Sequence, residues 1–404
     1  VLQLLGGADL LGLDTQNNPR DQVLYQGLQK LLVVVMIFLT GLPMVFAGNF
    51  LPPSDSLAAI LPLGTTGVRL LMFAQIFTGA VLILFMDEVI SKWGVGSGIG
   101  LFIVAGVSQK LIGGLFAIPQ VGASKNMGIF PTWLGIVAGY VDVPALLTPQ
   151  GLTELLIGRG AIVPLLTTLA IFVVVVYAES VRVEIPLSNA QVKGARGRFP
   201  VKLIYASVLP MILVRALQAN VQFLGRILNA QLQEDLPAFL GTYANGQPTS
   251  GLFYYLAPVQ SRADWMWWLE GTTQPVWQIL IRVGIDLTVM LVGGAIFAVF
   301  WVETTDMGPE ATAQQIHESG MQIPGFRRNI RSIERVLEQY IPQVTVIGGA
   351  LVGLLAVLAN MLGTIGGISG TSLLLTVSIT YKLYEEIAEE QLMEMHPMMR
   401  QLFG

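Results

Sequence analysis

The chain contains no cysteine, only two histidines, and few charges for its length. Of its 404 residues, 12% are charged, whereas a soluble globular domain carries about 25%. A chain without cysteine forms no disulfide, and two histidines do not supply a Cys/His metal centre. No nucleophile motif, metal-ligand spacing or nucleotide-binding loop is found, and the glycine-rich stretch 94–100 fits neither GxGxxG nor the Walker pattern. The sequence therefore gives no indication of a cofactor or of covalent enzyme chemistry.

What the chain does have is apolar surface, since 53% of its residues are hydrophobic and its mean hydropathy is +0.66. Exposing that much apolar surface to water is unfavourable, so lipid must be the solvent, and an all-α polytopic membrane protein is expected. A membrane-spanning helix needs about 20 mainly apolar residues. We therefore predict eight spans from the runs with few or no charges. They lie at 31–54, 70–86, 93–109, 160–178, 201–223 (interrupted by Arg215) and 276–302 (interrupted by Arg282 and Asp286), with two more inside 339–381.

The last run is too long for one span, and it contains a cluster of glycines at Gly363, Gly366, Gly367 and Gly370. Glycine clusters favour turns, so the run is divided there into two helices. A second glycine pattern, Gly349 and Gly353, has the GxxxG spacing that permits close approach of helices. This spacing is common by chance in apolar helices.

Lysine and arginine are distributed unequally between the two sets of loops. One set, which includes 179–202, 303–338 and the tail from Lys382, carries fourteen of them, and the opposite set carries six. Positively charged loops stay in the cytoplasm, so we expect the C-terminus to be cytoplasmic. The two basic loops have two interpretations, topology alone or a docking surface for a polyanion or a partner. In the opposite set, the external segment 228–275 is acidic and rich in tryptophan, which suits anchoring at the membrane interface.

Away from their ends, the predicted spans contain three ionisable residues, Arg215, Arg282 and Asp286. Such residues are functional candidates by default. Arg282 and Asp286 are four residues apart, so they share a helix face and could pair. A structural pair near the membrane edge is the favoured interpretation. A proton- or ion-coupled transporter usually carries more buried carboxylates.

Five motifs occur in the order found in one membrane-protein family. They are DEVISKWGVGSGIGLFI at 87–103, YAESVRVEIP at 177–186, FWVETT at 300–305, IPGFR at 323–327 and LLTVSI at 374–379. The chain resembles the SecY family, the central subunit of the Sec protein-conducting channel, over essentially its whole length. The residues of these motifs resemble archaeal and eukaryotic members more than bacterial ones, and an archaeal source is preferred.

The resemblance implies ten spans in two pseudo-symmetric halves around an hourglass pore. The eight predicted spans then correspond to the third to tenth of the family. Residues 1–117 are expected to form the N-terminal half without its first span, plug and most of its second span, which suggests an incomplete chain. Residues 118–152 would be an external connector, and residues 153–404 the C-terminal half.

The resemblance also implies a ring of apolar side chains at the waist of the pore. Ile99 and Ile103 would come from one half, and Ile212 and Leu374 from the other. Such a ring offers no hydrogen bonds to a passing chain, and a narrow apolar constriction dewets and resists ion leakage. Without the resemblance, an ordinary core or lipid-facing role is the favoured interpretation of these residues.

The family opens sideways into lipid, which here implicates 31–46 facing 208–223. Asn220 lies on the second of these segments, where its amide could bond across a closed gate. An amide that faces pore water is an equally good interpretation.

The resemblance assigns the basic loops to ribosome docking, through a set of residues shared by the two loops: Lys193, Arg196, Arg198, Lys202, Arg327 and Arg328. It also implies SecE and a beta subunit as partners, together with the nascent chain, its signal peptide and membrane lipid. The expected location is the plasma membrane. The function implied is conduction of secretory polypeptides and sideways release of membrane-protein segments.

Two other functions remain open. A secondary transporter for a small solute also uses broken helices, but it needs converging polar groups at the midplane. A membrane-embedded enzyme would need a nucleophile and base, or metal ligands, at membrane depth.

Overall fold

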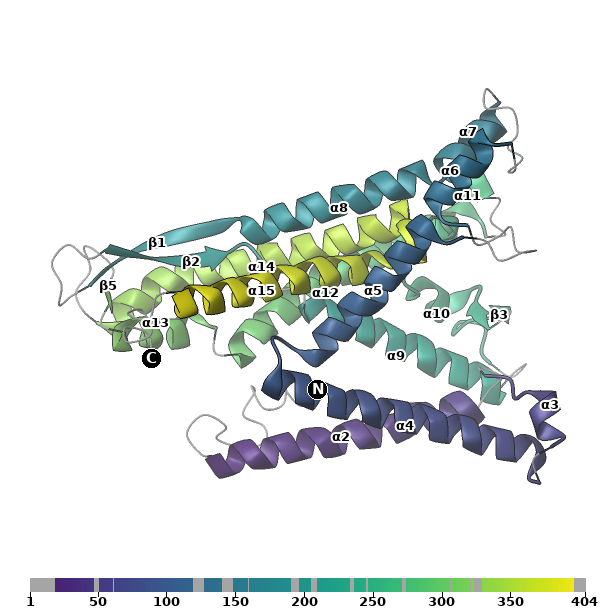
Figure 1. Cartoon of the computed structure of the whole chain (residues 1–404), viewed down its shortest axis with the longest axis horizontal. Helices are drawn as coiled ribbons and strands as arrows, with labels where there is room; N and C mark the ends of the chain where they lie inside the picture. Colours follow the sequence, from purple (N-terminus) through teal and green to yellow (C-terminus); the bar gives the residue numbers. More distant parts are fainter. Residues whose placement is uncertain are drawn as a thin grey trace. The chain divides into compact units, whose positions relative to one another are not determined.

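The structure is a computed structural model of the chain (Figure 1). It describes residues 19–46, 51–60, 62–118, 127–139, 148–158, 160–189, 196–204, 209–232, 236–244, 246–270, 274–305, 307–319, 321–322 and 329–395. The chain forms two compact units. Unit 1 comprises 1–99 and 215–257, and unit 2 comprises 100–214 and 258–404. The division into sequence halves at 118–152 stays a prediction.

Unit 2 is built on long helices, namely α5 (Gly98–Phe116), α8 (Ile162–Ser180), α12 (Val276–Thr304), α14 (Ile330–Leu362) and α15 (Gly370–Met395). In Figure 1, α8, α14 and α15 run side by side, and α12 packs along α14. Small residues allow this close packing. A Cβ added at Gly349 would lie 2.6 Å from the carbonyl oxygen of Gly294, and one at Gly353 would lie 2.3 Å from that of Met290. The GxxxG pattern is therefore a helix–helix contact.

Unit 1 contains the pair α2 (Pro19–Phe46) and α4 (Gly64–Trp93), joined through α3 (Asp55–Ala58). Their contact includes the rings of Phe38, Phe73 and Phe77, with centroids 5.3 to 6.4 Å apart. At one end the Lys30 ammonium lies 2.8 Å from the Glu88 carboxylate. Most of α9 (Leu209–Leu232) also belongs to this unit.

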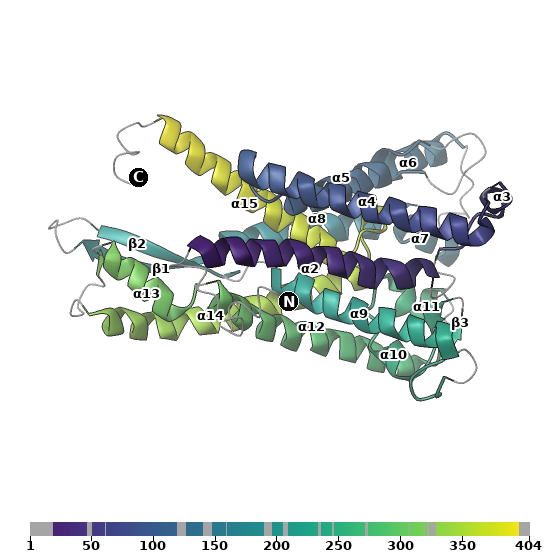
Figure 2. The same cartoon turned by 90° about the horizontal axis from the view of Figure 1, so that it is seen from below.

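A small antiparallel sheet has the strand order β2–β1–β5 and joins two separate stretches of the sequence, one between α8 and α9 and one before α14. It contains β1 (Arg182–Asn189), β2 (Arg196–Lys202) and β5 (Met321–Gln322). Figures 1 and 2 both show β1 and β2 extending past the end of α8, beside α13 (Pro309–Glu318). The sequence predicted only loops at 179–202 and 303–338.

Short elements complete the described part of the chain. They are α6 (Ile129–Val137), α7 (Pro149–Leu156), β3 (Tyr243–Ala244), β4 (Gln247–Pro248), α10 (Gly251–Tyr255), η3 (Arg262–Asp264), α11 (Trp267–Glu270) and η4 (Ile365–Gly367).

Each of the eight predicted spans overlaps a long helix, so the helical fold class is confirmed. Six helices of the described residues are long and apolar enough to cross a membrane. α9 and α15 fall short. α9 contains several amides besides Arg215 and Arg226, and α15 becomes charged from Lys382 onward. The start predicted near 201 is wrong, because 201–202 end a strand and the helix begins at Leu209. An uncharged run cannot distinguish the end of a strand from the start of a helix.

Candidate functional site

Three of the four predicted ring residues belong to one apolar cluster in unit 2. Leu374, 1% exposed, is one of the buried members of this cluster, and the partly buried Ile103 and Ile212 pack against the cluster. Ile99, the fourth, is assigned to unit 1 and its side chain is 53% exposed. The cluster also includes buried residues of α8, α12 and α14. The structure therefore groups Ile103, Ile212 and Leu374, and the assignment of all four to a pore ring stays a prediction.

The turn between α14 and α15 fixes the start of the helix that carries Leu374. Gly363, Gly366 and Gly367 have φ of +80°, +67° and +64°, values that side chains disfavour. The Asn360 carboxamide oxygen accepts a hydrogen bond of 2.5 Å from the Gly370 backbone N–H, inside the first turn of α15. The predicted break of the long run at these glycines is confirmed.

The same turn contacts α5 and α8. The Thr168 hydroxyl oxygen accepts a hydrogen bond of 3.1 Å from the Ile365 N–H. A Cβ added at Gly114 would lie 2.7 Å from the Gly366 nitrogen, so the two backbones touch there. These contacts set the position of α15 relative to α5, the helix that carries Ile103.

The N-terminus of α5 is capped by an acidic residue near the end of α4. The Asp87 carboxylate accepts a hydrogen bond of 2.9 Å from the Ile99 N–H. A Cβ added at Gly98 would lie 2.6 Å from the Asp87 Cα, so only glycine fits there. The conspicuous Asp87–Gly98 motif thus has a local structural role, which is to hold a tight α4–α5 corner next to Ile99.

On α9, Asn220 is exposed. Two neighbouring polar groups are engaged. The Arg215 guanidinium donates to the Gln218 side chain at 2.8 Å, and the Gln222 amide donates to the Phe253 carbonyl at 2.8 Å. The gate role of Asn220 stays a prediction, and so do both interpretations of its amide.

The two predicted basic loops meet in one sheet. β1 and β2 pair from Arg182 opposite Lys202 to Ser188 opposite Arg196, and β1 then pairs with β5 from the second loop. The backbone of Arg196 and Arg198 lies in β2. Lys193, Arg327 and Arg328 lie outside the described residues. The Lys202 ammonium lies 2.5 Å from the Glu385 carboxylate of α15.

An apolar cluster anchors this sheet to α13 and α14. Ile185 of β1 and Val201 of β2 are buried against Ala313, Ile316 and Leu337 of α13 and α14. Alternation along the strands turns Ile185 and Val201 to this cluster.

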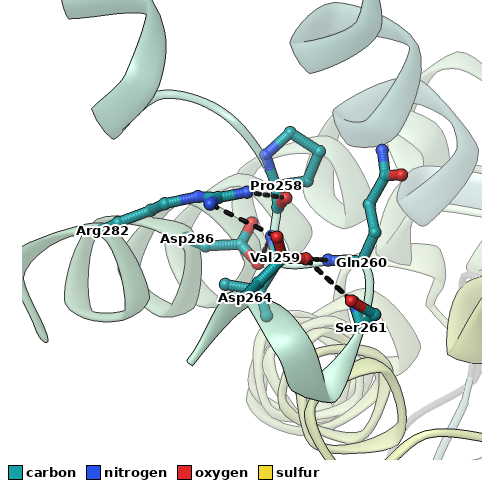
Figure 3. Close-up of polar contacts among 7 residues, drawn as sticks. All are labelled: Pro258, Val259, Gln260, Ser261, Asp264, Arg282 and Asp286. Atoms are coloured by element: carbon teal, nitrogen blue, oxygen red, sulfur yellow. Dashed lines mark hydrogen bonds and ion pairs between the residues drawn. The ribbon is translucent and has the colours of Figure 1, made fainter. Parts of the chain in front are cut away.

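The sequence did not indicate that the two ionisable residues of α12 contact the segment 258–264 of the same chain (Figure 3). Arg282 donates a hydrogen bond of 2.9 Å to the Pro258 carbonyl and lies 3.5 Å from the Asp264 carboxylate. Asp286, only 1% exposed, accepts a hydrogen bond of 3.1 Å from the Val259 N–H. Both side chains therefore hold the segment 258–264, which their sequence spacing alone could not indicate.

Hydrogen bonds within the segment 258–264 also stabilise its conformation. The Asp264 carboxylate accepts hydrogen bonds from the N–H groups of Gln260 and Ser261, at 2.9 and 3.0 Å (Figure 3). The next residue, Trp265, donates its indole N–H to the Met361 carbonyl at 2.8 Å, near the end of α14. The segment is thereby tied to both α12 and α14.

Within the part of the chain that the structure describes, no group of acidic and histidine residues is arranged to hold a metal ion.

Comparison with known proteins identifies the family. The family model for SecY matches residues 1–384. The protein translocase subunit SecY of Haloarcula marismortui is 78% identical over 404 residues, covering 100% of this chain and 82% of that protein, and that of Haloferax volcanii is 72% identical with the same coverage.

Solved structures agree with this match. A protein-conducting channel has a TM-score of 0.72 and 34% identity, covering 98% of this chain and 80% of that one. Sec61 in the canine ribosome–channel complex has a TM-score of 0.70 and 34% identity, with the same coverage. The motifs, the helical fold and both kinds of match lead to one conclusion: the chain belongs to the SecY family.

Proposed function

We propose that this chain is the pore-forming subunit of an archaeal-type protein translocase, and that it supplies a path for polypeptides and no covalent chemistry. The observation that carries the proposal is the match to SecY along nearly the whole chain, at 78% identity to a haloarchaeal translocase subunit. The small-solute transporter loses its best candidate site, because Arg282 and Asp286 hold the segment 258–264.

The pore constriction is proposed to form from Ile99, Ile103, Ile212 and Leu374. In support, three of these share one apolar cluster, and their side chains have no hydrogen-bonding group to retain a passing chain. Sideways release into lipid would occur between 31–46 and 208–223, where Asn220 presents an exposed amide.

The sheet β2–β1–β5 is proposed as the root of a ribosome-docking surface, with Arg196 and Arg198 on β2 and Lys193, Arg327 and Arg328 nearby in the sequence. Pairing of β1 with β5 supports one surface instead of two. A related channel, Sec61, occurs in a ribosome–channel complex. The further partners would be SecE and a beta subunit. The protein would lie in the plasma membrane, with its C-terminus in the cytoplasm.

A photo-crosslinking residue placed at Ile103 or Leu374 tests the pore. With a stalled secretory nascent chain in the translocase, both positions should crosslink to that chain. Leu337 is a control matched to Leu374, because it is as buried as Leu374 but lies in the other apolar cluster. It should give no crosslink. Failure at both Ile103 and Leu374 would remove the pore assignment.

Docking is tested by Arg196→Glu, which reverses one charge on β2. If this residue contacts ribosomal RNA, affinity should fall, and the loss should shrink as salt rises, because phosphate contacts are screened. Unchanged ribosome binding at low salt would exclude Arg196 from the docking surface.

A further inference from the structure

One lysine of the basic loops is already engaged within the protein. The Lys202 ammonium lies 2.5 Å from the Glu385 carboxylate and 5.8 Å from the ring centroid of Tyr381, both on α15. About a third of each side chain of the ion pair is exposed, 34% for Lys202 and 32% for Glu385. A phosphate contact by Lys202 would have to compete with this carboxylate.

A buried acid lies beside this pair. Glu179, in the last turn of α8, is 3% exposed and interacts electrostatically with Lys382 and Lys202. The Ser378 side chain also lies beside the Glu179 carboxylate and favours its charged form. Burying a carboxylate is costly unless a charge compensates it. Two lysines, one from β2 and one from α15, offset part of that cost.

Strands β1 and β2 form an antiparallel pair, called here the β1–β2 hairpin, which contacts the rest of the protein on two sides. Val201 is fully buried against α13 and α14. Strand alternation turns its neighbour Lys202 the other way, toward α15. The Leu203 N–H donates to the Val181 carbonyl at 2.8 Å, which closes the base of the hairpin just after α8. The root of the hairpin is thus bound to α8 and α15 through charges.

We propose that Lys202, Glu385, Glu179 and Lys382 form a network of charged side chains, called here the charged joint. This network would couple ribosome binding at the hairpin to the position of α15. Leu374 lies on the same helix, eleven residues before Glu385, or about 16 Å along its axis. This inference rests on the proposed function, since it takes the hairpin as the docking element. Lys202 is then a positioning residue of the channel and not a phosphate contact.

The test separates binding from transport in the full-length chain within its membrane complex. Lys202→Glu, Glu385→Lys and the charge-swapped double variant are compared with Arg196→Glu. Two quantities are measured, the ribosome affinity and the translocation of a secretory nascent chain, the latter per folded channel. A purely structural role would lower the amount of folded channel and leave the second quantity unchanged.

The single variants should bind ribosomes within about twofold of the parent but translocate at least about threefold more slowly, and the double variant should recover. Lys202→Arg keeps the charge and should behave as the parent. Loss of ribosome binding in Lys202→Glu, as in Arg196→Glu, would overturn the inference. Normal translocation in both single variants, or no recovery in the swap, would overturn it too.

If the charge reversals do not accumulate in the membrane, Lys202→Met and Glu385→Gln replace them, since both remove the charge at similar side-chain length. Each should show the same separation of binding from translocation, and its absence would overturn the joint. Failure of the proposed docking function gives a different result. In that case Arg196→Glu would bind ribosomes normally, and the effect of the charge swap on translocation could still be measured.

Discussion

Gly294 and Gly349 set how closely α12 approaches α14. A Cβ at Gly294 would lie 2.6 Å from the Gly349 carbonyl oxygen and 2.7 Å from the Met211 side chain. Two backbones in contact gain dispersion energy along both helices, and a single methyl group removes that contact.

Gly294→Ala should therefore destabilise unit 2 by about 1–3 kcal/mol, the usual cost of overpacking. Gly284→Ala is the matched control, because it lies in the same helix with open space around it. Alanine there should be neutral or stabilise by up to about 1 kcal/mol. The measurement is thermal unfolding in detergent micelles. Equal midpoints for the two variants would contradict the close-contact interpretation.

Asp286 shows why an intramembrane carboxylate need not be a transport group. It is buried, and it accepts the Val259 N–H. Asp286→Ala leaves that N–H without this acceptor, at a cost of about 1–3 kcal/mol. We expect the segment 258–264 to open and become susceptible to protease, while Asp286→Asn, which keeps an acceptor oxygen, should retain most of the protection. Similar cleavage of both variants would mean that the hydrogen bond is unimportant.

The turn between α14 and α15 combines two different demands on glycine. Gly366 and Gly367 have nearly the same positive φ, but only Gly366 is crowded, with the Lys110 carbonyl oxygen 2.4 Å from an added Cβ. Both alanine variants bear the cost of a left-handed backbone, about 1–2 kcal/mol.

Gly366→Ala should cost more than Gly367→Ala, because it also pushes α5 away from the turn. The difference between the two unfolding midpoints isolates the contact with α5. If Gly367→Ala proved the more damaging change, the close approach of α5 to this turn would be wrong.

Helix positions were predictable from the sequence because charges are scarce and mark the ends of apolar runs. The glycine turn at 363–370 was also predictable, since the uncharged run exceeded the length of one span. The hairpin was not recognised. Its signal was the alternation of Val183, Ile185 and their neighbours with charged residues, obscured by the basic charge of the loop. Pairing of β1 with β5 joins strands more than a hundred residues apart, which local pattern cannot reveal.

Of the candidate site, the sequence could supply residues but not their contacts. Leu374 was placed by its motif, and the structure adds that it is buried in the cluster. The engagement of Lys202 with Glu385 could not be predicted, because the two are 183 residues apart. Ion pairs between distant segments depend on the folded path of the chain.

At the scale of the whole molecule, the excess of lysine and arginine predicts which ends of the helices face the cytoplasm. The chain has no cysteine, so a single added cysteine reports its own location. Three exposed sites suffice: Phe239, between α9 and α12; Glu318, at the end of α13; and Tyr384, on α15. A membrane-impermeant maleimide is applied to intact cells and then to permeabilised ones.

Phe239→Cys should react in intact cells, whereas Glu318→Cys and Tyr384→Cys should react only after permeabilisation.

Tyr384 is the decisive site, because α15 is not apolar enough along its length to qualify as a span on its own. If α14 crosses the membrane and α15 does not, Tyr384 will lie opposite Glu318 and react in intact cells. If α15 completes the crossing inside the protein, shielded by the helices around its buried first turns, Tyr384 and Glu318 will behave alike. The second outcome is expected, since Leu373, Leu374 and Leu375 are all buried in the apolar cluster of unit 2. A helix enclosed by other helices needs less apolar surface than one that faces lipid.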